Sequence, residues 1–107
     1  MRFLVTTNGQ YPVPPEQLPA ILTAEREWRD RYADRLEAYG SFVGPAGGYG
    51  IVDVADAGVL SEMVASHPFS PFCETTVRPI TEFDTVARNL AAAVEQRLRQ
   101  ASPLATA

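Results

Sequence analysis

The chain has 107 residues, a length that allows one domain and leaves no room for a second. Its hydrophobic share of 46% and charged share of 21% are those of a folded globular protein, not of a disordered chain. A net charge of −4 and the absence of any basic run argue against a nucleic-acid partner.

The N-terminal segment MRFLVTTNGQ carries one basic residue and a short apolar stretch. It therefore predicts a strand over 2–8, closed by the Asn8-Gly9 turn, and not a signal peptide. No run of the sequence approaches membrane-spanning length, so we expect a cytoplasmic protein without a membrane partner.

Apolar residues at helical spacing predict a long first helix over 16–39, ended by Gly40. The following segment SFVGPAGGYGIVDVAD predicts two short strands around a glycine-rich turn, which form a hairpin. Asp56 is placed to cap a second helix. That helix ends before the turn-rich SHPFSPF, and CETTVRPI (73–80) predicts a fourth strand, in which Pro79 fits a sheet edge.

A third helix is predicted from Asp84, taken as its N-cap, to residue 101. Val86, Leu90, Val94 and Leu98 recur along it at helical spacing. Residues 102–107 are expected to form a disordered tail.

The order strand, helix, strand, strand, helix, strand is the split βαβ unit of ferredoxin-like folds, here with an extra C-terminal helix. We expect one such domain over 1–101. Two crossover helices cover one sheet face, so a partner subunit is expected on the other, giving a dimeric α+β barrel or a larger homo-oligomer. Cys73, Thr75 and Val77 should face the helices, and Glu74 and Arg78 the partner.

At about 100° per residue, the apolar residues of the first predicted helix share one arc. They are Leu18, Ile21, Leu22, Trp28, Tyr32, Leu36 and Tyr39. Glu25 falls near the middle of this arc and Arg29 beside it. A buried charge is costly unless it is paired or hydrogen-bonded, so the two charges need each other or a wet cleft beneath the helix.

Two interpretations of this pair stay open. The simpler is a structural ion pair, because an acid four residues before a base is a favourable helical arrangement. The other is a site in which Glu25 carries a proton and Arg29 binds a carboxylate or an enolate oxygen.

Other chemistry is limited by scarce residue types. Cys73 is the only cysteine, His67 is the only histidine, and all nine basic residues are arginine. These counts exclude, within one chain, disulfides, cysteine-based or multi-histidine metal sites, and Schiff-base lysine chemistry. We expect no metal and no other cofactor. Cys73 is interpreted as an inert core residue.

His67 lies between a predicted helix end and Pro68, where a cation can cap the helix. Because the pKa of an imidazole is close to neutral pH, His67 is also the side chain best suited to be a second proton carrier. Tyr32 and Tyr49 could orient a substrate oxygen, although a tyrosine on a core arc more commonly packs.

Four segments carry a family resemblance over about residues 1–80: MRFLV with the Pro12-Val13 that follows, EREW, IVDV and HPFSPFCETTV. They resemble the muconolactone isomerase family. Its stretch before the last strand is matched by Pro68, Pro71 and Phe72, and its recurrent helical Glu by Glu25. The resemblance implies small ferredoxin-like chains that associate and enclose a site between helix and sheet, with an acid–base role for Glu25. The helix over 84–101 is an addition to that pattern.

The sequence thus favours a cofactor-independent isomerase or cyclase that moves a proton on a small carbonyl- or lactone-bearing substrate, in aromatic catabolism or polyketide tailoring. Glu25 and His67 are the candidate catalytic residues. The candidate substrate-binding residues are Arg29, Trp28, Tyr32, Tyr49 and Phe72. One alternative is a cofactor-free monooxygenase of an aromatic polyketide, and another is a non-catalytic binding or assembly subunit.

Overall fold

A computed structural model describes residues 1–101 of the chain; the disorder predicted for 102–107 lies outside the described residues. One antiparallel sheet has the strand order β2-β3-β1-β4. The strands are β1 (Arg2–Gly9), β2 (Leu36–Ser41), β3 (Gly47–Asp53) and β4 (Cys73–Ile80). The helices are α1 (Leu18–Arg31), α2 (Ala57–Ser66) and α3 (Phe83–Ala101). This is the predicted ferredoxin-like α+β fold with an extra C-terminal helix.

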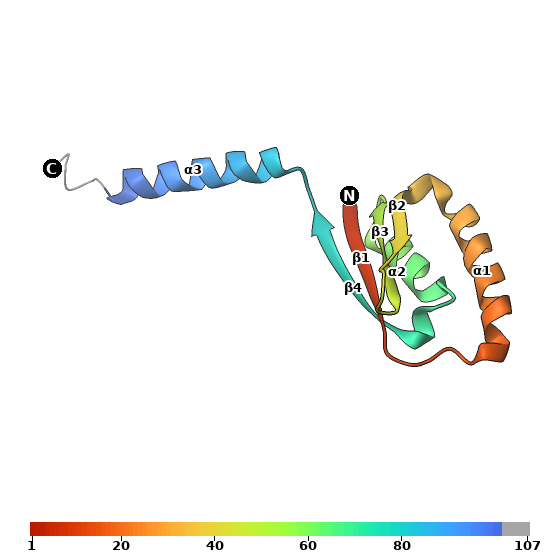
Figure 1. The fold of residues 1–107 in the computed structure, drawn as a ribbon. Helices are drawn as coiled ribbons and strands as arrows, with labels where there is room; N and C mark the ends of the chain where they lie inside the picture. Colours follow the sequence, from red (N-terminus) through yellow and green to blue (C-terminus); the bar gives the residue numbers. More distant parts are fainter. Residues whose placement is uncertain (102–107) are drawn as a thin grey trace.

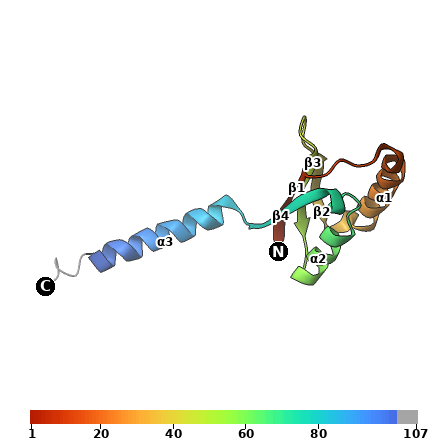
Figure 2. The same cartoon turned by 90° about the horizontal axis from the view of Figure 1, so that it is seen from below.

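Helices α1 and α2 lie on the same face of the sheet, as Figures 1 and 2 show. The buried core lies between them and that face. It consists of Trp28 in α1, Tyr32 just after α1, Leu60 and Met63 from α2, and Val52 and Val54 in and just after β3. Because the core occupies only part of this layer, space remains between α1 and the sheet.

Strand β4 lies at a sheet edge, which suits Pro79 because proline has no N–H to donate to a further strand. Its register on β1 pairs Thr75 with Thr7 and Val77 with Val5. The helix-facing side of β4 therefore carries Cys73, Thr75 and Val77, as predicted. Glu74 and Arg78 lie on the open face.

The first helix is shorter than predicted. A 3₁₀ turn precedes α1 at Pro15–Gln17, α1 itself ends at Arg31, and the predicted end of the helix forms strand β2 instead. The register between β2 and β3 shifts between Leu36 and Ala38. This β-bulge puts Leu36 and Tyr39, three residues apart, on the same side of the sheet, and a spacing of three imitates a helix.

The other helix boundaries are closer to prediction. The side-chain Oδ1 of Asp56 accepts a hydrogen bond of 3.0 Å from the backbone N–H of Val59, which confirms Asp56 as the N-cap of α2. Helix α3 begins at Phe83, so Asp84 lies inside the first turn and is not the cap that was predicted. Within residues 1–101, no helix is both long and apolar enough to cross a membrane.

Candidate active site

A cavity of about 630 Å³ lies between the helix-facing side of the sheet and helices α1 and α2. This volume is within the range of small-molecule sites. Most of its lining is apolar. Strand β3 contributes Gly50, which pairs with Val5 on one side and Tyr39 on the other. Because a glycine adds no side chain there, part of the cavity floor is left bare.

Four polar side chains on the cavity wall form one connected chain of hydrogen bonds. The Arg29 guanidinium contacts Glu25 twice, with Nε 2.7 Å from Oε1 and Nη2 3.2 Å from Oε2. The Tyr39 hydroxyl donates to Glu25 Oε1 at 2.6 Å and lies 3.0 Å from His67 Nε2. Glu25 is only 9% exposed, so its charge depends on these partners.

The direction of this chain follows from the far side of His67. The backbone N–H of Phe69 donates to His67 Nδ1 at 3.2 Å, so Nδ1 carries no proton and the neutral ring carries its proton on Nε2. Nε2–H then donates to the Tyr39 oxygen, and the Tyr39 hydroxyl donates to Glu25. Each proton in the chain therefore points toward the Glu25 carboxylate.

Burial favours the same protonation states. It lowers the pKa of His67, against the smaller opposing effect of the Glu25 carboxylate. Burial also raises the pKa of Tyr39 well above its usual value, and the hydrogen bond to Glu25 raises it further. At neutral pH, His67 is thus an uncharged donor and Tyr39 keeps its proton.

Trp28 holds the aromatic wall of the cavity in place. Its indole Nε1–H donates to the Met63 carbonyl at 3.1 Å and lies 3.2 Å from Ser66 Oγ, so α2 fixes the orientation of the ring. The His67 ring meets Trp28 nearly edge-on, with centroids 4.6 Å apart. The imidazole is therefore positioned by packing as well as by hydrogen bonds.

The structure brings most of the predicted site residues to this cavity. Lining it are Glu25, Trp28, Arg29, Tyr49, His67 and Phe72. The predicted residue Tyr32 is not among the lining residues; it is buried behind Trp28, with its hydroxyl 3.4 Å from Glu62. Tyr49 is among the lining residues, but its pairing with Gly40 and Thr6 places its ring on the open face of the sheet, pointing away from Glu25.

His67 is the C-cap residue of α2 by its backbone, whose N–H donates to the Val64 carbonyl at 3.4 Å. Its ring turns toward Tyr39 and the cavity. Cys73 also lines the cavity, and burial raises the pKa of its thiol, which keeps it protonated at neutral pH. Among the described residues, no three His, Cys, Asp or Glu side chains come together as a metal site.

Tyr39 is the site residue that the sequence interpretation missed. Assigned to a helix, it would lie about 21 Å from Glu25, at 1.5 Å per residue. In the structure its hydroxyl touches Glu25 because the chain turns back at Ala33–Arg35 and enters β2. The available signal was the segment LEAYGS, whose last residue, Ser41, is the first residue of the predicted hairpin.

The fold and site define a small ferredoxin-like α+β protein with a mostly apolar cavity that has the Glu25 carboxylate on its wall. No protein-family model and no curated protein matches the sequence. Among solved structures, muconolactone isomerase aligns with a TM-score of 0.67 and 20% identity, over 77% of this chain and 90% of that chain. The chain therefore shares the fold of muconolactone isomerase, as the resemblance implied.

A second structure is 5-chloro-2-hydroxyhydroquinone dehydrochlorinase (TftG) from Burkholderia phenoliruptrix AC1100, in complex with 2,5-dihydroxybenzoquinone. It aligns with a TM-score of 0.63 and 15% identity, over 79% of this chain and 98% of that chain. An antibiotic biosynthesis monooxygenase is a more distant likeness, with a TM-score of 0.43 and 17% identity over 77% of this chain and 100% of that chain.

Proposed function

We propose that this protein is a cofactor-independent isomerase or cyclase that moves a proton on a small carbonyl- or lactone-bearing substrate. The proposal rests on one observation: Glu25 is a nearly buried carboxylate at the wall of a mostly apolar cavity, held by Arg29 and Tyr39. Muconolactone isomerase and the TftG dehydrochlorinase share the fold, and their names favour a substrate of aromatic catabolism. A polyketide-derived substrate would fit the same chemistry.

In the proposed reaction, Glu25 removes a proton from the carbon next to the substrate carbonyl. The electron pair of the broken C–H bond moves into an enolate, whose oxygen is stabilised by Arg29 and the Tyr39 hydroxyl. Glu25 then returns the proton to another carbon of the same conjugated system. His67 supports this cycle as a second proton carrier, because its Nε2–H already donates to Tyr39.

The remaining wall residues have the proposed task of binding. Trp28 and Phe72 offer flat apolar surfaces on the cavity, and a substrate bound against them would displace water and strengthen the charge interactions beside it. We further propose that the protein acts in the cytoplasm as a homo-oligomer on a small-molecule substrate.

Two other functions each have an observation in their favour. The Trp28, Tyr39 and His67 rings beside the cavity would suit a cofactor-free monooxygenase of an aromatic polyketide. Glu25 and Arg29 form an ion pair with each other, which would suit a non-catalytic binding or assembly subunit. Oxygen consumption during turnover would identify the first, and loss of folding in a Glu25→Gln variant would favour the second.

The decisive variant is Glu25→Gln, which keeps the shape of the side chain and removes the base. With a panel of butenolides and enol lactones in D₂O, proton exchange at the carbon next to the carbonyl, followed by NMR, should fall about 100-fold or more. Glu27→Gln, on the exposed side of the same helix, should leave exchange unchanged. Unreduced exchange in a folded Glu25→Gln protein would exclude Glu25 as the base.

A further inference from the structure

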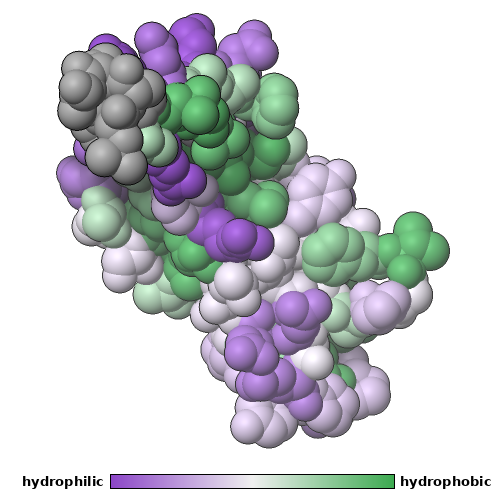
Figure 3. All heavy atoms as spheres, turned by 90° about the vertical axis from the view of Figure 1, so that its left-hand side faces the viewer, coloured by the Kyte–Doolittle hydropathy of each residue, from purple (hydrophilic) through white to green (hydrophobic). Residues whose placement is uncertain are grey.

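Helix α3 carries an apolar stripe with large exposed side chains. The stripe consists of Phe83, Val86, Leu90, Val94 and Leu98. Phe83 is 79% exposed, Leu90 60% and Leu98 65%. The opposite side of the helix carries the Glu95–Arg99 ion pair, at 3.7 Å. Figure 3 looks toward the C-terminal end of α3 and shows hydrophobic side chains gathered apart from hydrophilic ones. A helix divided in this way is built to lie against an apolar surface.

Within residues 1–101, no other helix or strand packs along α3. The helix projects away from the sheet in both ribbon views (Figures 1 and 2). The chain consequently measures 76 × 27 × 22 Å, with a radius of gyration of 20.5 Å. A compact chain of this length would have a radius of gyration of about 13 Å. The surface that the stripe requires is therefore not provided by the described part of its own chain.

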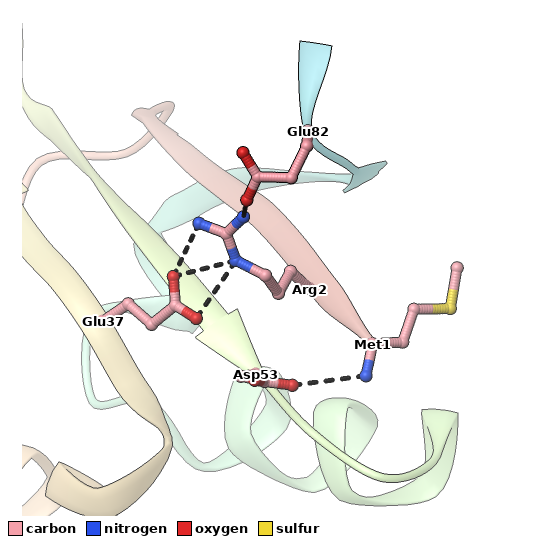
Figure 4. Close-up of polar contacts among 5 residues, drawn as sticks. All are labelled: Met1, Arg2, Glu37, Asp53 and Glu82. Atoms are coloured by element: carbon pink, nitrogen blue, oxygen red, sulfur yellow. Dashed lines mark hydrogen bonds and ion pairs between the residues drawn. The ribbon is translucent and has the colours of Figure 1, made fainter. Parts of the chain in front are cut away.

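A surface ion pair links the segment just before α3 to the body. Only Thr81 and Glu82 separate β4 from α3, and Glu82 forms an ion pair of 3.2 Å with Arg2. Arg2 in turn holds Glu37 at 2.7 Å, so three separate segments meet at this point (Figure 4). The helix leaves from the side of the sheet opposite α1 and α2 (Figure 1). Its stripe is thus held out on the open side of the sheet.

We propose that α3 is an exchanged arm, whose apolar stripe packs against the body, residues 1–82, of a second copy of the chain. The open sheet face, with Leu4 and Ile51, lies on the side toward which the arm projects. Each copy therefore carries an arm and an uncovered face. When two copies are related by a two-fold axis, the arm of each can pack on the open face of the other. The arm is about 28 Å long, enough to span a sheet and a helix layer of roughly 10 Å each.

The formal charges of α3 and of residues 1–82 also favour packing of α3 on a second copy of the chain. Residues 1–82 carry six arginines and eleven carboxylates, a net of −5, whereas α3 carries three arginines and two carboxylates, a net of +1. The arm and the body of a second copy therefore attract each other. A membrane surface is a poorer match, because the stripe has no Trp and the polar side of α3 has little positive excess. This inference concerns assembly and does not depend on the chemistry proposed for the cavity.

The test compares Leu90→Glu with Ala92→Glu, which adds the same charge on the opposite side of α3. In light scattering over a concentration series, Leu90→Glu should raise the dissociation constant of the assembly about tenfold or more. Ala92→Glu should leave it unchanged. The proposal that α3 packs on a second copy would be contradicted if the wild type were a monomer at all concentrations, or if both variants assembled equally well. Binding to phosphatidylserine-containing vesicles that Leu90→Glu abolishes would also contradict it, since the stripe would then serve a membrane.

A photo-crosslinking residue, p-benzoylphenylalanine, placed at Leu90 of the full chain gives an answer even if Leu90→Glu fails to fold. In a mixture of ¹⁵N-labelled and unlabelled copies, cross-links should join position 90 to residues 1–82 of the other copy. Cross-links within one copy, or only between two α3 helices, would contradict packing of the arm on the body.

Discussion

The two sides of this sheet differ in how completely their side chains are partnered. On the helix-covered side, Glu25, Tyr39 and His67 form one hydrogen-bonded chain, and Trp28 donates to α2. On the open side, no helix or strand within residues 1–101 packs along the sheet face, and the stripe of α3 is exposed. The two proposals therefore assign chemistry to the helix-covered side of the sheet and assembly to its open side.

This separation predicts that the two sides respond differently to mutation. Changes near the core and cavity should alter stability or turnover in a single copy. Changes on α3 should alter assembly, with little effect on the folding of one copy. Mutations on both sides can therefore test the separation directly.

The largest expected effect is on stability in the core. Met63 is 1% exposed, and Met63→Ala should lower the free energy of unfolding by about 2–5 kcal/mol through lost burial and a residual cavity. Leu90→Ala, the matching truncation on α3, should change it by less than about 0.5 kcal/mol in dilute solution, because Leu90 is 60% exposed. Urea unfolding at low protein concentration measures both. A large loss for Leu90→Ala there would mean that α3 packs on its own body.

A second prediction concerns the bare cavity floor at Gly50. A Cβ atom added there meets Ala38 O at 3.5 Å and Tyr39 Cδ2 at 3.9 Å, ordinary contact distances. Gly50→Leu should therefore fold while filling part of the cavity, and turnover should fall about tenfold or more as substrate is displaced from its reacting position. Ala38→Leu adds a similar side chain on the open face and should spare turnover. Equal turnover in wild type and Gly50→Leu would place the substrate elsewhere.

Much of the fold was accessible from local patterns. The strands around Val5 and Val77 show β-branched composition, Asp56 is a recognisable cap, and the element order defines the topology. The end of the first helix was not accessible. Leu36 and Tyr39 keep a helical spacing because of a β-bulge, and a bulge depends on the pairing partner, which a local pattern does not contain.

The candidate site residues also divide into those that a local sequence pattern predicts and those that depend on the tertiary fold. Glu25 and Arg29 were predictable because both lie on one helix, whose periodicity alone shows that a charge faces inward. Tyr39 and His67 come from a strand and a helix end that the tertiary fold brings together, so their contact with Glu25 does not follow from the helical spacing that placed Tyr39 on the same arc. Tyr49 was chosen by residue type, and the strand register turned its ring to the other face.

The smallest expected effect is a pH dependence of stability from His67. Burial lowers its folded-state pKa below the ordinary value of 6.5, so below that value the unfolded chain binds the proton more readily than the folded one. The contribution of neutral His67 is thus complete above pH 6.5 and declines as the pH falls through 6.5 toward the lower folded-state pKa. Protonation of Nδ1 would also break its hydrogen bond from Phe69.

His67→Gln should flatten this decline in urea unfolding measured between pH 7.5 and pH 5, relative to wild type. The Glu25 carboxylate opposes the shift, so the difference in slope between the two proteins should be modest. A wild-type slope that His67→Gln leaves unchanged would mean that the ring takes up its proton equally well in the folded and unfolded chains. A steeper decline in wild type, together with a flat His67→Gln profile, would establish that the cavity holds the imidazole neutral.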